Sequence, residues 1–248
     1  MTKNLENLSS REYPGRVIIV GQDKTGDNMV VIYAITGRSP SSQARKLELE
    51  EDAIWASPTD EEALKKGNRD LLVYPAILFV PARGIAVSNG QQTSDIGSHL
   101  LKSQNPLEIL ESALFQWDFE PDGPIFTPRI SGCVLSGKGA ALSIIRRGSD
   151  GSSSRNFYEV PLVSGRGMMI ATYRGENRNP VPSFTGEPVE VEIHKKRADG
   201  MAEAVYDALA PEPGKKDLRV SVACVYSRKV SAGQNEIYII NRKSGTEE

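Results

Sequence analysis

Short runs of β-forming residues recur along the chain, and clusters of turn residues separate them. Residues 16–22 (RVIIVGQ) and 29–36 (MVVIYAIT) flank a polar segment that contains Gly26, Asp27 and Asn28. This composition is typical of a hairpin connection, so we expect the chain to open with two antiparallel strands. A doubly wound parallel sheet would instead require a long crossover, usually a helix, between successive strands.

The same pattern continues to the C-terminal region. Further strands are expected over residues 71–80, 84–88, 129–135, 140–146, 157–163, 168–173, 218–226 and 236–240. Pro75 predicts an edge position, a bulge or a strand break, because proline cannot donate a hydrogen bond within a sheet. Residues 132–139 (GCVLSGKG) place a lysine between glycines, which favours a hairpin turn over a phosphate loop. Residues 148–155 predict a flexible connection, and residues 176–188, rich in Pro and Gly, predict a long irregular loop.

Two stretches break this pattern with a helical repeat. Asn105 can cap a helix, Pro106 suits its first turn, and large apolar residues then recur on one face as far as Trp117. Residues 198–209 predict a second helix, and a shorter one fits residues 94–102. The order of strands and helices therefore predicts an α+β domain in which helices cover antiparallel sheet.

Length and charge limit the number of domains and the class of ligand. A chain of 248 residues with 39% hydrophobic residues suits a single domain, which we place at residues 13–248 after a polar lead at 1–12. The 30 Lys and Arg nearly balance the 32 Asp and Glu, so no overall field attracts nucleic acid or an anionic membrane. No apolar run approaches the roughly 20 residues that span a bilayer. The first residues are polar, unlike a secretory signal, so we expect a cytoplasmic protein.

Several familiar catalytic motifs are missing from the sequence. It contains no phosphate-binding loop motif, no dinucleotide-binding glycine motif and no nucleophile elbow, and its only histidines are His99 and His194. A histidine-based triad or metal centre is therefore disfavoured. Cys133 and Cys224 lie in apolar runs without CxxC spacing, which predicts buried free thiols.

Polar residues near strand ends are the remaining candidates for a site. Arg38 and Ser39 follow the second strand, and Arg45 lies a few residues further on, so two guanidiniums can converge on one anion. Two solvated loop arginines would show the same spacing. Asn89 and Gly90 end another strand, and they fit either a turn or an amide that binds a ligand carbonyl.

An acidic segment precedes one of the expected strands. Asp118, Glu120 and Asp122 alternate in WDFEPDGPIFTPR and would share one side of an extended segment, although a solvated acidic loop has the same composition. Arg129 then begins the strand. Tyr74 stands in an otherwise apolar strand, where a core or edge aromatic is the ordinary interpretation.

Taken in order, these residues resemble the archaeal-type inosine monophosphate (IMP) cyclohydrolase family. The motifs that carry the resemblance are YPGR at residues 13–16, GRS followed by Arg45, Tyr74, VSNG with Thr93 and Asp95, DFEPD followed by TPRI, and ATY ending at Tyr173. The resemblance is strongest over residues 13–173, and residues 218–242 lie beyond it. It implies the four-layer αββα sandwich of the N-terminal nucleophile hydrolase fold.

The resemblance also implies a reaction, the closure of 5-formamidoimidazole-4-carboxamide ribonucleotide to IMP with loss of water. Glu120, Tyr74 and Asn89 match the family's catalytic positions, where they would move protons, donate to an oxyanion and hold a substrate oxygen. The implied substrate-binding residues are Arg38, Ser39, Arg45 and Arg129. The expected partner is a purine ribonucleotide; no metal or organic cofactor is implied, and a homo-oligomer is allowed.

Two other functions stay open. A purine-nucleotide-binding protein that has lost the chemistry would keep the same loop arginines. An N-terminal nucleophile amidohydrolase would use Thr2 after removal of Met1. A polar lead separates Thr2 from the first strand, so we expect Thr2 to be an ordinary residue.

Overall fold

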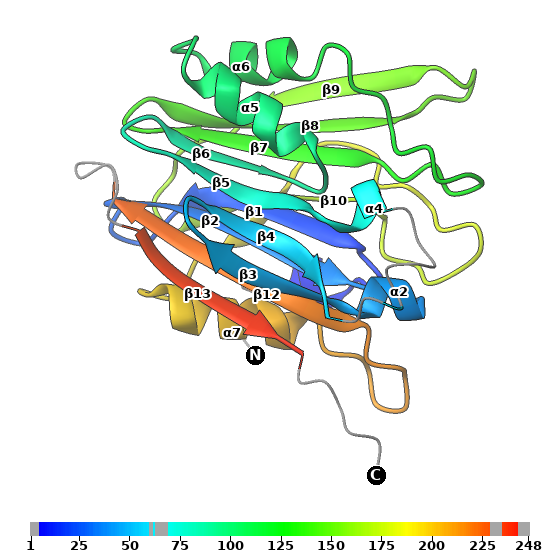
Figure 1. Ribbon diagram of the computed structural model, residues 1–248. Coiled ribbons are helices and arrows are strands. Elements are labelled where there is room, and N and C mark those ends of the chain that lie inside the picture. Colours follow the sequence, from blue (N-terminus) through cyan, green and yellow to red (C-terminus); the bar gives the residue numbers. More distant parts are fainter. Residues whose placement is uncertain (1–4, 60–61, 63–68, 229–234, 243–248) are drawn as a thin grey trace.

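The strands form two antiparallel sheets in the computed structural model, which describes residues 5–59, 62, 69–228 and 235–242 (Figure 1). The six-stranded sheet has the order β11 (Val189–Glu192), β10 (Arg166–Ala171), β1 (Arg16–Gln22), β2 (Asn28–Thr36), β12 (Arg219–Arg228) and β13 (Asn235–Asn241). The seven-stranded sheet follows sequence order: β3 (Arg45–Glu50), β4 (Ala53–Pro58), β5 (Tyr74–Val80), β6 (Gly84–Ser88), β7 (Arg129–Leu135), β8 (Gly139–Arg147) and β9 (Ser153–Glu159).

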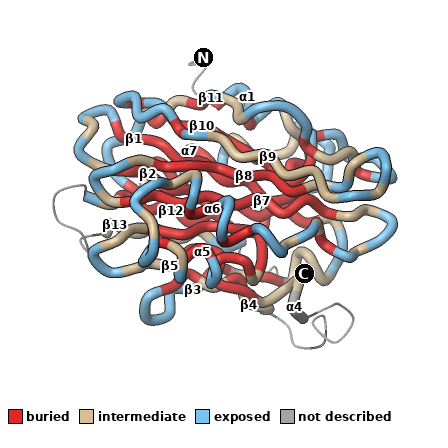
Figure 2. The backbone as a smooth tube through the Cα atoms, turned by 90° about the horizontal axis from the view of Figure 1, so that it is seen from above, coloured by how far each residue is buried: buried red, intermediate tan, exposed pale blue. Residues whose placement is uncertain are grey.

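The main core lies between the two sheets and extends to the outer face of the six-stranded sheet. Residues 17–20 of β1 are all buried, although neighbouring side chains on a strand point to opposite faces. One face packs on the other sheet, and helices α1 (Glu6–Ser9) and α7 (Ala198–Ala208) add Leu8, Met201 and Val205 to the same cluster. Figure 2 shows these buried strands at the centre of the molecule. Burial on both faces explains why β1 and β2 read as continuous apolar runs.

A second core lies on the outer face of the seven-stranded sheet. Helices α5 (Gln92–Leu100) and α6 (Pro106–Ala113) cover this face, as Figure 1 shows. Strand β7 serves both cores, because Val134 packs between the sheets while Cys133 packs under the helices. This sheet is therefore also covered on both sides along its central strands.

The expected α+β domain with a four-layer αββα sandwich is wrong. The described residues form thirteen strands in two antiparallel sheets, and the helices are short and few. The two helices not yet given are α2 (Pro40–Gln43) and α4 (Arg69–Leu72). Since α5, α6 and α7 are isolated elements on parts of the outer faces, the architecture is predominantly antiparallel β.

Most predicted strands are confirmed, with some changes at their ends. The hairpin of β1 and β2 has the expected pairing, and β6 and β7 have the predicted bounds. The predicted strand 71–80 begins at Tyr74, and Pro75 lies beside a register shift between β4 and β5, so the bulge is confirmed. The edge alternative is wrong because β5 pairs on both sides. Strand β9 begins inside the stretch that was predicted to be a flexible connection.

Several local predictions are also resolved. The side chain of Asn105 accepts a hydrogen bond from the backbone N of Leu107 (2.9 Å), as expected of a helix cap, but α6 ends before Trp117. The two cysteines, Cys133 and Cys224, are free and buried. Residues 136–138 form the turn between β7 and β8 rather than a phosphate loop. Among the described helices, none has the length and apolar character needed to cross a membrane.

Candidate functional site

A group of buried polar residues lies where several strands begin. Arg16, Arg45, Tyr74 and Arg129 are the first residues of β1, β3, β5 and β7, and all four are buried. Strands β3, β5 and β7 run in the same direction because their intervening neighbours are antiparallel, so their first residues lie at one end of the sheet. The fold therefore gathers three cationic or phenolic side chains at one end of the seven-stranded sheet.

Glu120 is the acidic member of this group. It lies in the segment between α6 and β7, and only 2% of its surface is exposed. Its backbone N donates to the carbonyl of Thr127 (2.9 Å), which anchors the segment beside β7. Burial raises the pKa of Glu120 to about 7, although the positive charges of Arg16 and Arg129 act against this rise. A carboxyl group with this pKa can both accept and return a proton near neutral pH.

A chain of hydrogen bonds connects Glu120 to Arg129. Nδ2 of Asn89 donates to Oε1 of Glu120 (3.0 Å), and Nε2 of Gln92 donates to Oδ1 of Asn89 (3.2 Å). Nη1 of Arg129 then donates to Oε1 of Gln92 (3.0 Å). The Arg129 guanidinium also stacks over the ring of Trp117 at 4.8 Å from the centroid. Asn89 and Arg129 thus belong to one buried network with Glu120.

Two further guanidiniums carry buried N–H groups without partners. Within the described part of the chain, Nε of Arg16 and both Nη atoms of Arg45 have no hydrogen-bond partner. Burial, and next the charge of Arg16, lower the pKa of Arg45, so the two cations lie within electrostatic reach of each other. Arginine nevertheless stays protonated in proteins. Buried donors of this kind are typical of a site that binds an anion.

Tyr74 forms a buried pair with Tyr33 of β2. Their hydroxyl oxygens lie 2.8 Å apart, and both side chains are fully buried. The charges of Arg16 and Arg45 act on Tyr33, and burial raises its pKa well above the usual value. The pair joins the two sheets at the polar end of the core and provides a hydroxyl group beside the two cations.

Arg38 and Ser39 have partners outside this buried group. Arg38 is partly exposed, and it donates to the side chains of Asn177 (3.4 Å) and Asn179 (3.2 Å) and to the carbonyl of Arg178 (3.1 Å). Ser39 is exposed and caps the short helix α2. Arg38 therefore binds the predicted irregular loop, whereas Nε of Arg45 donates to the carbonyl of Ser42 (3.2 Å).

The three alternating acids Asp118, Glu120 and Asp122 have different surroundings in the structure. Asp118 is exposed and pairs with Arg155 (2.9 Å), whereas Asp122 accepts from the backbone N of Thr127 (2.6 Å). Only Glu120 is buried in the network with Asn89.

Sequence reasoning missed Arg16, Tyr33 and Gln92 as members of the site. Arg16 carries a detectable signal, because it is a charged residue at the head of an otherwise apolar strand. Tyr33 stands inside a continuous apolar run, and apart from its hydroxyl group nothing in the sequence indicates that it belongs to a site. Gln92 lies in the segment after the Asn89–Gly90 pair, where an amide side chain is unremarkable.

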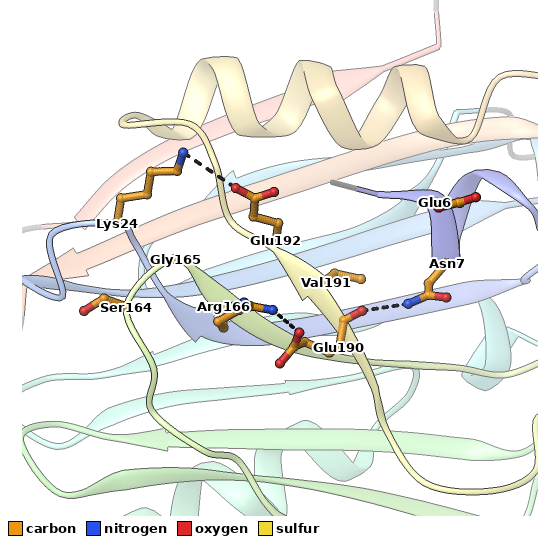
Figure 3. Close-up of a pocket in the computed structure, with 9 residues that line it drawn as sticks. All are labelled: Glu6, Asn7, Lys24, Ser164, Gly165, Arg166, Glu190, Val191 and Glu192. Carbon is orange, nitrogen blue, oxygen red and sulfur yellow. Dashed lines mark hydrogen bonds and ion pairs between the residues drawn. The ribbon is translucent and has the colours of Figure 1, made fainter. Parts of the chain in front are cut away.

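A groove with a volume of about 680 Å³ lies away from this group. Figure 3 shows it between α1, β10 and β11. Both of its cations already have acidic partners, because Lys24 pairs with Glu192 (3.6 Å) and Arg166 pairs with Glu190. We therefore place the candidate site at the buried polar group rather than at this groove. Within the described residues, no three His, Cys, Asp or Glu side chains gather as metal ligands would, and Thr2 lies outside those residues.

The raised pKa of Glu120 predicts a pH-dependent stability. Between the ordinary value of 4.5 and the folded value of about 7, the folded protein keeps a proton that the unfolded chain releases. Stability contributed by this group therefore falls as pH rises through that window and stays low above it. The free energy of unfolding of Glu120→Gln, relative to wild type, should rise across the window by about 3 kcal/mol. Urea denaturation at several pH values checks this; a difference independent of pH contradicts it.

Comparison with known proteins identifies one matching family. Residues 13–230 match the model of a family described as IMP cyclohydrolase-like protein. The match spans most of the chain and continues past residue 173 to include β12, which was expected to lie beyond the resemblance. Comparison with curated proteins gave no match.

Proposed function

Because the chain belongs to the IMP cyclohydrolase-like protein family, we propose that it closes 5-formamidoimidazole-4-carboxamide ribonucleotide to IMP with loss of water. The observation that carries the proposal is the position of Glu120. This buried carboxyl group, with a pKa of about 7, lies within electrostatic reach of Arg16 and Arg45, which carry three buried nitrogen atoms without described partners. A proton carrier beside an anion site suits a reaction that moves protons on a phosphorylated substrate.

The chemistry requires a proton carrier because an amide nitrogen is a poor nucleophile. The carboxamide nitrogen attacks the formyl carbon, a C–N bond forms, and Glu120 takes the proton that leaves the nitrogen. The former formyl oxygen takes a proton from solvent and becomes a hydroxyl group on the new ring. Glu120 then gives its proton to that hydroxyl, the C–O bond breaks and water leaves. The former formamido nitrogen loses its proton to solvent and forms the C=N bond with the former formyl carbon. General acid–base catalysis of this kind contributes about 10² to 10⁴ in rate.

Two other groups support these steps. Tyr74 can donate a hydrogen bond to the formyl oxygen as negative charge develops there, and its contact with Tyr33 holds its hydroxyl group in place. Binding both reacting groups in one orientation lowers the barrier further, since intramolecular positioning contributes up to about 7 to 11 kcal/mol in favourable systems.

The 5′-phosphate of the substrate suits the buried guanidiniums. We assign the phosphate to Arg16 and Arg45, because phosphate oxygens would satisfy their unpartnered N–H groups and neutralise two neighbouring cations. Arg38 and Ser39 lie in the segment before Arg45, and there they would contact an outer part of the nucleotide.

The test is direct. The purified protein is incubated with the formamido ribonucleotide, and the appearance of IMP is followed beside a sample without protein. Protein-dependent formation of IMP supports the proposal. Binding of IMP without its formation would identify a nucleotide-binding protein that has lost the chemistry. If the protein neither bound IMP nor converted the substrate, the assignment of a purine nucleotide ligand would be wrong.

A further inference from the structure

The side chain of Asn89 has no hydrogen-bonding capacity left for a ligand. Its Nδ2 donates to Oε1 of Glu120 (3.0 Å) and to the carbonyl of Pro128 (3.0 Å). Its Oδ1 accepts from the backbone N of Ile130 (2.8 Å) and from Nε2 of Gln92 (3.2 Å). An asparagine amide offers two donor hydrogens and two acceptor positions, so all four are used.

Backbone groups determine which way this amide points. The N–H of Ile130 can only donate, and the carbonyl of Pro128 can only accept. Exchanging the oxygen and nitrogen of Asn89 would break both bonds. The NH₂ group is therefore held on the carboxyl group of Glu120, and the oxygen is turned away from it.

Gln92 extends the same chain of donors towards Arg129. It is fully buried, and its Oε1 accepts from Nη1 of Arg129 (3.0 Å). A guanidinium has no acceptor, so every hydrogen in the chain is directed from Arg129 towards Glu120. Hydrogen bonds aligned in this way polarise one another, which strengthens the donor on Oε1 of Glu120.

We infer that Asn89 and Gln92 are positioning residues, which hold Glu120 by its Oε1 atom and leave Oε2 as the oxygen that exchanges a proton with the substrate. Among the described residues, no hydrogen bond reaches Oε2. The identity of the substrate rests on the proposed function, whereas the hold on Glu120 does not. The charged groups that face Glu120 come from β1, β3, β7 and its own segment, and they are Arg16, Arg45, Arg129 and Asp122.

The titration of Glu120 tests this inference without any substrate. In protein labelled with ¹³C-glutamate, the carboxyl resonance that is absent from Glu120→Gln identifies this residue. Asn89→Ala removes a donor to the charged form, so the midpoint should move up by about one pH unit. Gln92→Ala should move it less in the same direction, because the bond from Asn89 remains but loses its polarising neighbour. Asn89→Ser provides a second variant if the alanine protein does not fold.

Two comparisons make the result decisive. Asn105→Ala makes the same substitution at the cap of α6, away from Glu120, and it should lower stability without moving the midpoint. Midpoints in Asn89→Ala, Asn89→Ser and Gln92→Ala equal to that of wild type would overturn the inference. So would a loss of IMP affinity of more than tenfold in Asn89→Ala, because that points to direct contact with the nucleotide. If wild type forms no IMP, the proposed function fails, while the titration still decides the positioning role.

Discussion

Glu120→Gln is expected to lower the turnover of ring closure by about 10² to 10⁴, while the affinity for IMP changes little. The substitution keeps the shape of the side chain and an oxygen that can accept the bond from Nδ2 of Asn89. It removes the group that takes and returns the proton, which is needed in the transition state and not in the complex with product. Single-turnover kinetics and calorimetry with IMP measure the two effects separately.

A matched variant controls for the substitution itself. Glu111→Gln makes the same change on the exposed side of α6 and should keep full turnover. Tyr74→Phe should also lower turnover, because it removes the hydroxyl group that donates a hydrogen bond to the formyl oxygen and that lies 2.8 Å from the hydroxyl oxygen of Tyr33. If Glu120→Gln kept full turnover, the family assignment would stand, but another group would have to move the proton.

Local patterns were enough to predict the central strands. In RVIIVGQ and MVVIYAIT, β-branched residues and a turn composition between the runs agree with the hairpin that forms. Strands β3 (RKLELE) and β4 (AIWASP) were not expected, because charges interrupt the first, and alanine, serine and proline weaken the β-forming pattern of the second. Strand β3 lies at the edge of its sheet, where alternating charges are usual and the apolar signal is weak.

The fold class could not be settled from the same patterns. The apolar faces of residues 92–100, 106–113 and 198–208 indicate that each helix packs on something, and each packs on an outer face of a sheet. They do not indicate what share of that face a helix covers. The prediction of a four-layer sandwich came from the resemblance to a known family. In the structure, most of the described residues form two packed antiparallel sheets.

The site was partly visible for a topological reason. Arg45, Tyr74 and Arg129 are far apart in sequence, but antiparallel pairing brings the first residues of alternate strands to one end of a sheet. A sequence alone does not show that β1, from the other sheet, brings Arg16 to the same place. Arg38 and Arg45 are close in sequence, which suggested a shared anion site, but the side chain of Arg38 binds the loop around Asn177 and Asn179.

Replacing Arg45 by Met is expected to stabilise the empty protein and to weaken its binding of nucleotide. Only 3% of the surface of Arg45 is exposed, and both of its Nη atoms lack a partner among the described residues. Burying a charge without a partner costs several kcal/mol, and the neighbouring charge of Arg16 adds to this cost. Methionine keeps the unbranched apolar stem, so the free energy of unfolding should rise by about 1 to 3 kcal/mol.

The effect on binding should have the opposite sign, and this difference separates a functional guanidinium from a structural one. Loss of charge-assisted hydrogen bonds to phosphate should weaken IMP binding by about 1.5 to 3 kcal/mol, which corresponds to roughly 10- to 150-fold in Kd. Arg228→Met, at the exposed end of β12, should change neither property appreciably. Urea denaturation of the empty protein and calorimetry with IMP provide the two measurements. A structural arginine would lower stability when replaced and leave affinity unchanged, so that pattern in Arg45→Met would contradict the phosphate assignment. A more stable protein that binds nucleotide poorly is expected only if the cost of burying two neighbouring cations is offset when the anion binds.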